Sequence, residues 1–108
     1  MIAYVVGAGA VGRFLGERLR SERTEIVYAP RALEDVVPVE AGLAIVAVKS
    51  YDTAGAIATL RAALGQATEA TILCVQNGVG NEELLAAAFG PDAVVAGALT
   101  IPVALAQD

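Results

Sequence analysis

The chain has 108 residues, a formal net charge of −5, one cysteine and no histidine. This length predicts a single domain, residues 1–108, with a core of its own. The acidic balance, without any block of basic residues, argues against nucleic acid as a partner. One cysteine excludes an internal disulfide, and the lack of histidine removes the commonest general acid–base and every histidine-based metal site. We therefore expect no metal centre.

Hydrophobic residues make up 56% of the sequence, but no run is long enough for a membrane span. The late apolar stretch, residues 93–106, is interrupted by Gly97, Thr100 and Pro102 and falls short of the roughly 20 residues that a bilayer requires. No basic segment precedes the first apolar run, so we expect neither a signal peptide nor a membrane partner. The predicted location is the cytoplasm.

A glycine-rich turn follows the first apolar segment, residues 2–6. The turn consists of Gly7, Ala8, Gly9, Ala10, Val11 and Gly12. Apolar residues at helical spacing come next, so the order strand, G-x-G-x-x-G and helix predicts a dinucleotide site. Gly7 would form the tight turn, Gly9 would let a pyrophosphate approach the backbone, and Gly12 would let the helix pack closely. The competing interpretation is a strand-to-helix turn that binds nothing.

Apolar runs and helical patterns alternate along the rest of the chain. Strands are expected at residues 2–6, 25–29, 43–48, 71–75 and 93–96, with 100–106 as a sixth. Helices are expected from the glycine turn to about residue 20, at 53–64 and at 82–89, with a helical turn at 32–36. Ser50 or Asp52 would cap the second helix, and Gly65 would end it. The pattern predicts an α/β, Rossmann-like, doubly wound and mainly parallel sheet with helices on both faces.

Arg31 follows the second predicted strand, where NAD-binding versions of this fold carry an acid for the ribose 2′-hydroxyl. The strand end reads Tyr28-Ala29-Pro30-Arg31 and contains no acid. An arginine there suits the 2′-phosphate of NADP, so the cofactor predicted is NADP (NADPH). The alternative is a solvated surface arginine behind a proline turn.

Two further polar residues come at the ends of later strands. Lys49, the single lysine, follows the third strand, and Asn77 follows the fourth. Ligands of open α/β sheets bind at the carboxyl ends of the strands, which makes both residues candidates for the cofactor and substrate cleft. Lys49 is equally accounted for as a lysine that faces water beyond a buried strand.

Three stretches together resemble the ketopantoate reductase (2-dehydropantoate 2-reductase) family, whose members use NADPH in pantothenate synthesis. They are the glycine turn, residues 48–53 (VKSYDT) and residues 76–83 (QNGVGNEE). The resemblance implies that the turn binds the pyrophosphate of NADP and that Arg31 holds the 2′-phosphate. It further implies that Lys49 and Asn77 contact cofactor and substrate, a small 2-oxo acid, and that Val103 makes a backbone contact to the cofactor.

Members of this family are longer than this chain and carry a helical second domain. By resemblance, that domain supplies the lysine general acid and most of the substrate pocket, so we expect no catalytic residue within residues 1–108. The chain alone is expected to bind NADP weakly without turnover, and whether it is an enzyme by itself stays open. Residues 32–43 also look shorter than the corresponding family segment.

Two other interpretations remain at this point. One is a nucleotide-sensing or regulatory module without chemistry, which would have no need of Lys49 and Asn77 beside the nicotinamide. The other is a truncated product that associates with itself. In that case the apolar residues 93–106 would form the surface of a homodimer.

Overall fold

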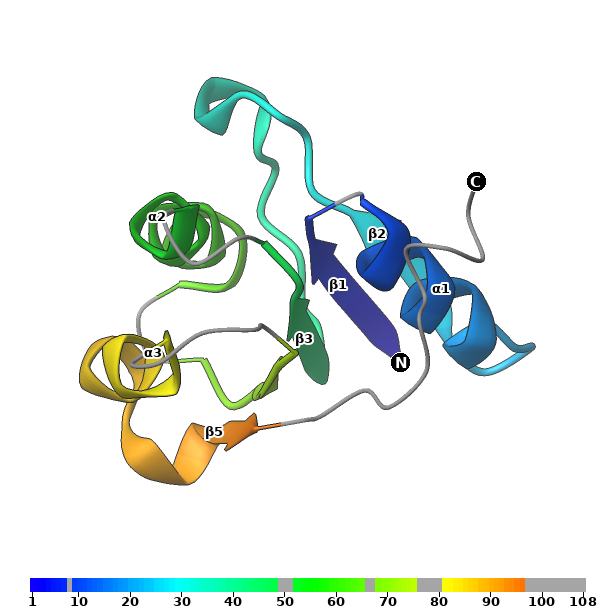
Figure 1. Ribbon diagram of the computed structural model, residues 1–108. Helices are drawn as coiled ribbons and strands as arrows, with labels where there is room; N and C mark the ends of the chain where they lie inside the picture. The colour runs from blue at the N-terminus through cyan, green and yellow to red at the C-terminus, as the bar shows by residue number, and fades with distance from the viewer. Residues whose placement is uncertain (8, 49–51, 66–67, 76–80, 97–108) are drawn as a thin grey trace.

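The computed structural model describes residues 1–7, 9–48, 52–65, 68–75 and 81–96 (Figure 1). Within these ranges the strands are β1 (Ile2–Val6), β2 (Glu25–Tyr28), β3 (Leu43–Val46), β4 (Thr71–Cys74) and β5 (Val94–Ala96). The α-helices are α1 (Ala10–Leu19), α2 (Thr53–Leu64) and α3 (Asn81–Phe89), and the 3-10 helices are η1 (Leu33–Asp35) and η3 (Pro91–Ala93).

The five strands form one parallel sheet in the order β2-β1-β3-β4-β5 (Figure 1). In the register of the sheet, Tyr4 of β1 lies between Val27 of β2 and Ala44 of β3. The chain runs outward from β1 to β2 and then returns past β1 to β3, so the direction of winding reverses between β1 and β3. Such a reversal opens a crevice outside the carboxyl ends of the strands, where open α/β sheets bind ligands.

Helices cover both faces of this sheet. Helix α1 lies on one face, while α2 and α3 lie side by side on the other (Figure 1). The fold is therefore a Rossmann-like, doubly wound α/β fold, as the sequence predicts.

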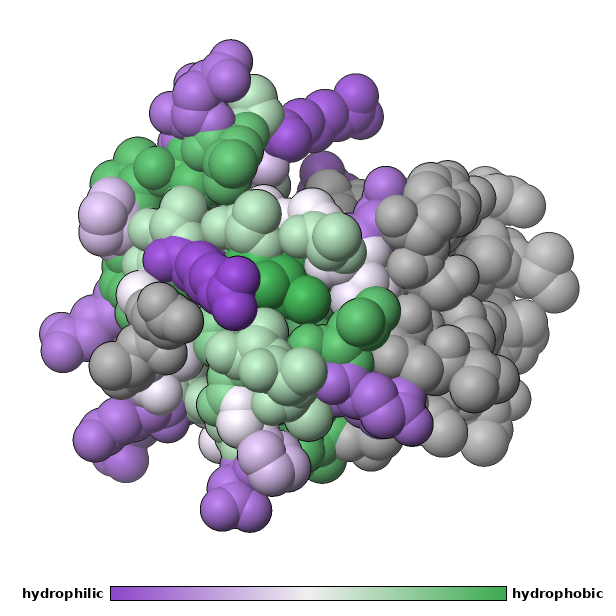
Figure 2. Space-filling model, turned by 90° about the vertical axis from the view of Figure 1, so that its left-hand side faces the viewer, coloured by the Kyte–Doolittle hydropathy of each residue, from purple (hydrophilic) through white to green (hydrophobic). Residues whose placement is uncertain are grey.

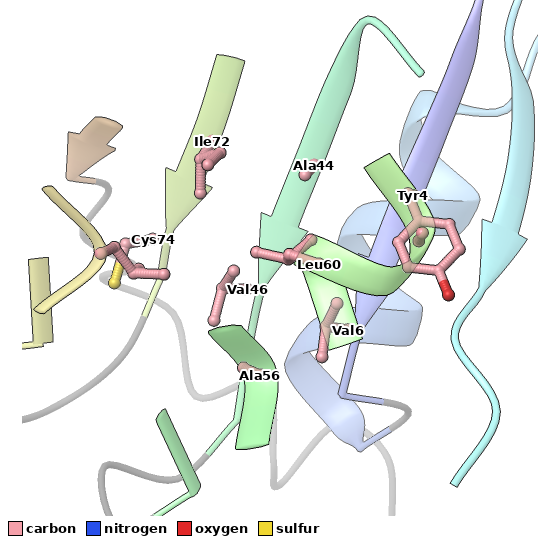
Figure 3. Packing of buried hydrophobic residues seen from close by; sticks show 10 residues of the cluster. Tyr4, Val6, Ala44, Val46, Ala56, Leu60, Ile72 and Cys74 are labelled. Atoms are coloured by element: carbon pink, nitrogen blue, oxygen red, sulfur yellow. The ribbon is translucent and has the colours of Figure 1, made fainter. Parts of the chain in front are cut away.

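Strand β1 shows why its residues are apolar without alternation. Tyr4 and Val6 face α2 and pack with Leu60 of that helix (Figure 3). Ala3 and Val5 face the opposite side of the sheet, where α1 covers them. Since residues on both faces are buried, a parallel central strand has no solvent side that would favour polar residues.

Within the described residues, the five expected strands and three expected helices are all present and differ mainly at their ends, while the 3-10 helix η3 was not expected. The third and fourth strands end at Val46 and Cys74, one or two residues earlier than expected, and the helical turn at 32–36 is the 3-10 helix η1. Gly65 ends α2 as predicted, with a φ of 80° and its N–H bonded to the Arg61 carbonyl at 3.0 Å. The sixth strand expected at 100–106 lies outside the described residues.

The outer side of α2 and α3 carries few large polar side chains. This face is mainly apolar or neutral, with separate charged side chains standing on it (Figure 2). Ala54 and Ala62 of α2 and Ala87 of α3 are exposed. None of the helices in the described ranges is long and apolar enough to cross a membrane.

Among the described residues, Tyr4 is the one with a buried side-chain polar atom, its hydroxyl oxygen, that has no hydrogen-bond partner. The side chain is 1% exposed, and burial raises the pKa of its hydroxyl. Because an unsatisfied buried hydroxyl has lost its bonds to water without replacement, it opposes folding.

We predict that Tyr4→Phe increases the free energy of unfolding by about 1 kcal/mol at pH 7, measured by denaturant titration. The raised pKa means that ionisation of Tyr4 favours the unfolded chain. The native protein should then lose stability as the pH rises above about 10, where unfolded tyrosine ionises, and the variant should lose less. A variant less stable than the native protein at pH 7 would show that the hydroxyl has a partner.

Candidate cofactor-binding site

Two glycines of the turn are required by the fold itself. Gly7 has a φ of 104°, and a Cβ there would lie 2.5 Å from the carbonyl oxygen of Ala47, the residue directly after β3. A Cβ on Gly12 would collide with the carbonyl oxygen of Gly7. A turn that bound nothing would still need these two glycines, so they do not by themselves indicate a ligand.

Gly9 differs, because nothing in the fold requires a glycine at its position. Its φ of −76° and ψ of −169° suit any residue, and a Cβ would meet no atom within 4 Å. The space beside its backbone is open and belongs to the cleft at the carboxyl end of β1. A glycine that the protein does not need for packing fits the close approach of a phosphate group to the backbone.

The N-terminus of α1 borders this open space, and no side chain in its first turn balances its partial positive charge. Gly9 is the N-cap and has no side chain to accept a bond from the first-turn N–H groups, and no acidic residue lies in that turn. Free N–H groups and the helix dipole together favour an anion. The turn residues therefore fit the pyrophosphate of a dinucleotide.

The cleft has a volume of about 590 Å³ and lies at the winding reversal between β1 and β3. Its floor comes from the end of β1, the glycine turn and Val48. One wall is the segment after β2 together with η1, and the other is the beginning of α2. The lining residues of the two walls are Ala29, Pro30, Arg31 and Leu33, and Asp52, Gly55, Ala56, Ala58 and Thr59.

Arg31 is exposed and lines this cleft, where the sequence places the 2′-phosphate contact. The backbone before it is fixed, because the N–H of Ala29 donates to the carbonyl of Val5 at 2.8 Å. Among the described residues that line the cleft, Arg31 is the single cation and Asp52 the single anion. The two opposite charges stand on opposite walls.

The end of β2 is tied to α1 by a polar cluster. The Tyr28 hydroxyl donates to Glu17 Oε2 at 2.8 Å, and Arg20 Nη2 and Nε donate to the same carboxylate at 3.0 and 3.1 Å. The hydrogen bond from Arg20, followed by that from Tyr28, holds the pKa of Glu17 below its ordinary value. A Cβ on Gly16 would lie 2.5 Å from the Tyr28 hydroxyl, so a side chain there would displace the Tyr28 ring from its present position. This cluster fixes the strand end from which residues 29–31 enter the cleft.

Asp52 does not act as the sequence suggests. It occupies the N-cap position of α2, but its carboxyl makes no capping hydrogen bond, and Asp52 is one of the residues that line the cleft. The other capping candidate, Ser50, lies outside the described residues. An acid before a helix is typical of a cap, so nothing in the sequence indicates that this one belongs to the site.

The structure brings some of the predicted cofactor contacts together. Gly7, Gly9 and Arg31 all line the cleft. Val11 and Gly12 lie in the first turn of α1, beside the cleft but not among its lining residues.

Other predicted contacts cannot be compared in this way. Ala8, Lys49, Asn77 and Val103 lie outside the described residues. Ala10 opens α1, but the position of its side chain is not described. The roles of these five residues stay predictions.

Leu33, Gly55 and Thr59 are among the lining residues that had no role in the sequence-based prediction. They come from the short turn η1 and from the interior of α2. Only the packing of η1 beside α2 shows that they share one cleft with Arg31. Across the described ranges, no group of three or more carboxylate or cysteine side chains could hold a metal ion.

Comparison with protein-family models matches residues 20–108 to the family described as Ketopantoate reductase PanE/ApbA. The chain belongs to this family. The match covers Arg31, the walls of the cleft and the segments with Lys49 and Asn77, but it begins after the glycine turn.

Individual relatives agree with this assignment. A curated 2-dehydropantoate 2-reductase from Halobacterium salinarum is 39% identical over 77 residues, which are 71% of this chain and 24% of that protein. The crystal structure of 2-dehydropantoate 2-reductase from Geobacter metallireducens superposes with a TM-score of 0.71 at 22% identity, over 89% of this chain and 40% of that one. These matches span less than half of each relative.

A third relative is the ketopantoate reductase of Staphylococcus aureus, which is described as dimeric and kinetically cooperative. It superposes with a TM-score of 0.67 at 22% identity, over 92% of this chain and 43% of that protein. At this level of identity the structural likenesses confirm the fold.

Packing requires a glycine at position 12 but not at position 9, and this difference can be tested by substituting alanine at each position. We predict that Gly9→Ala changes the free energy of unfolding by no more than about 1 kcal/mol, because the added Cβ meets no atom. If the turn binds a dinucleotide as the sequence predicts, the affinity of Gly9→Ala for NADPH should fall at least about 10-fold, or about 1.4 kcal/mol. Gly12→Ala should instead destabilise the fold by about 3 kcal/mol or more, because α1 must move away from the turn. Thermal unfolding and fluorescence titration measure the two effects, and an unchanged affinity in Gly9→Ala would remove Gly9 from the site.

Proposed function

We propose that this chain is the NADPH-binding domain of a ketopantoate reductase, the enzyme that reduces the 2-oxo acid 2-dehydropantoate to pantoate. The observation that carries the proposal is the cleft at the winding reversal, where the open space beside Gly9 and the guanidinium of Arg31 share one cavity in a member of this family. The open space beside Gly9 suits the pyrophosphate of NADPH, and the guanidinium of Arg31 suits its 2′-phosphate. These are the two charged parts of the cofactor.

Each residue has a role in this proposal. The glycine turn holds the pyrophosphate with the N–H groups at the start of α1, and Arg31 binds the 2′-phosphate. Lys49 and Asn77 follow β3 and β4 and serve the nicotinamide and the substrate carbonyl, and Val103 contributes a backbone contact. NADPH, when bound, supplies the hydride.

The chemistry also needs a proton and a charge partner for the oxygen that is being reduced. By family resemblance, we assign the proton to a lysine in a helical domain that is not represented in residues 1–108. The protein's own part here is to bind and orient the cofactor. A cytoplasmic location and pairing of two copies through residues 93–106 remain predictions from the sequence.

The deciding experiment compares NADPH with NADH on the native protein and on Arg31→Ala. We expect the native protein to prefer NADPH, and the variant to lose about 10- to 100-fold in NADPH affinity, because one charged hydrogen-bonded contact is worth about 1.5–3 kcal/mol. NADH affinity should change less than threefold. Arg23→Ala is the matched control, since Arg23 is exposed at the opposite edge of the sheet and its loss changes the net charge equally.

Equal binding of both cofactors by the native protein would contradict the role of Arg31. Failure to bind either one would contradict the proposed function. The alternative function, a nucleotide sensor, also predicts binding of NADPH. In a sensor, however, variants at Lys49 and Asn77 would leave the contacts of the nicotinamide unchanged.

Asp52 gives a second test of the same site. Its carboxylate lines a cleft that is proposed to take phosphate groups, so Asp52→Asn should remove a repulsion. We expect NADPH to bind about two- to fivefold more tightly at low salt, with the gain shrinking as ionic strength rises. Glu69→Gln, an exposed acid outside this cleft, should change the affinity by less than the Asp52 variant does. Weaker binding by Asp52→Asn would show that the carboxylate accepts a hydrogen bond from the cofactor.

A further inference from the structure

The arginines of this acidic chain are concentrated in one part of it. Five of its six arginines lie within residues 13–31, on α1, on the turn after it and behind β2, although the chain as a whole has a net charge of −5. Strand β2 is an edge strand of the sheet, and α1 lies beside it (Figure 1). Positive charge therefore gathers at this edge, and the proposed function uses only one of the five arginines.

Three of these arginines are engaged elsewhere. Arg20 donates from Nη2 and Nε to the Glu17 carboxylate at 3.0 and 3.1 Å. The guanidinium of Arg18 lies over the ring of Phe14, 4.8 Å from its centroid. Arg23 lies beside the amino ends of the strands, away from the cleft. None of these three is placed to face a ligand at the carboxyl end of β2.

Arg13 is placed differently, because it lies in the first turn of α1, directly after Gly12. Its N–H donates to the carbonyl of Gly9 at 3.0 Å, and its exposed guanidinium lies 5.4 Å from the centroid of the Tyr28 ring. Tyr28 is the last residue of β2, and Arg31 follows three residues later. Arg13 thus reaches the end of this strand from the side of α1, and Arg31 reaches it from the wall of the cleft.

The cleft itself provides little net positive charge for a phosphate-rich cofactor. A phosphomonoester such as the 2′-phosphate of NADPH carries about −1.5 to −2 charges at pH 7. Among the described lining residues, the charge of Arg31 is offset by that of Asp52 on the facing wall. An arginine stacked on an aromatic ring is suited to supply the missing charge, because stacking uses the face of the guanidinium while phosphate oxygens bind at its edge.

We propose that Arg13 is the second cation of the 2′-phosphate site, held on the ring of Tyr28 so that Arg13 and Arg31 bind this group together. The inference rests on the proposed function and adds to it a residue outside the cleft lining that determines the preference for NADPH over NADH. The Tyr28 ring is fixed in turn, since its hydroxyl donates to Glu17 Oε2 at 2.8 Å. Arg20 pairs with the same carboxylate and so offsets the negative charge that Glu17 would set against a phosphate.

The test compares two pairs of ligands whose members differ only by the 2′-phosphate. These are NADPH with NADH, and adenosine 2′,5′-bisphosphate with adenosine 5′-monophosphate. Arg13→Ala should lower the affinity for NADPH and for the bisphosphate about 3- to 10-fold, because one charged contact to the phosphate is lost. The affinities for NADH and for the monophosphate should change by less than about twofold.

The matched control is Arg18→Ala. This variant removes another exposed arginine of α1 that is stacked on an aromatic ring, and it changes the net charge equally. It should change the affinity for all four ligands by less than about twofold.

Two further variants separate the charge of Arg13 from its shape and from Arg31. Arg13→Lys keeps the positive charge but loses the planar guanidinium, so it should retain part of the preference for NADPH. A double variant with alanine in place of both Arg13 and Arg31 should bind NADPH no more tightly than NADH.

The outcomes separate this inference from the function on which it rests. An equal loss of affinity for all four ligands in Arg13→Ala would show that Arg13 only supports the strand end, and would overturn the inference. Suppose instead that NADPH affinity is unchanged in Arg13→Ala, while the native preference for NADPH collapses in Arg31→Ala. That result would overturn the second cation and leave the proposed function standing. No binding of NADPH or NADH by the native protein would overturn both.

Discussion

The close packing of Gly12 against the carbonyl of Gly7 is the constraint on which the rest of this structure depends. It lets α1 start directly above the end of β1, with no side chain between the helix and the turn. The free N–H groups of the helix then face the same space that Gly9 leaves open. The Tyr28–Glu17–Arg20 cluster fixes the other side of α1 to β2, which brings Arg31 to the edge of that space.

The charges of the cleft follow from this geometry. The described residues that line it contribute one arginine and one aspartate, on facing walls, within a chain of net charge −5. Binding of a phosphate-rich cofactor therefore depends on local placement, because the long-range field of an acidic chain repels an anion. Backbone N–H groups are suited to such a site, since they attract an anion without adding a charged side chain.

Much of this architecture could be predicted from the sequence, because it depends on local pattern. Runs such as residues 43–46 have no polar face, which indicates a buried parallel strand, and Gly65 ends α2 for a conformational reason that is readable in advance. The walls of the cleft were not predictable in the same way. Asp52 looks like a helix cap, and Gly55 looks like a weak point in a helix. Their role appears only when η1, some 20 residues away in sequence, lies opposite α2.

The connection from β2 to β3 carries a short 3-10 turn instead of a full helix, and both of its ends are anchored by the backbone. The Ala29 N–H is bonded to the Val5 carbonyl at 2.8 Å, and the Gly42 N–H is bonded to the Ile2 carbonyl at 3.0 Å. Between these two anchors, Arg31 and Leu33 contribute to the cleft. The segment is also tied to the core, because the Val39 N–H is bonded to the Ala63 carbonyl of α2 at 2.8 Å and Val36 and Val39 pack against buried residues. Substitutions that reshape this wall of the cleft without disturbing the core are therefore confined to its exposed residues, such as Arg31 and Leu33.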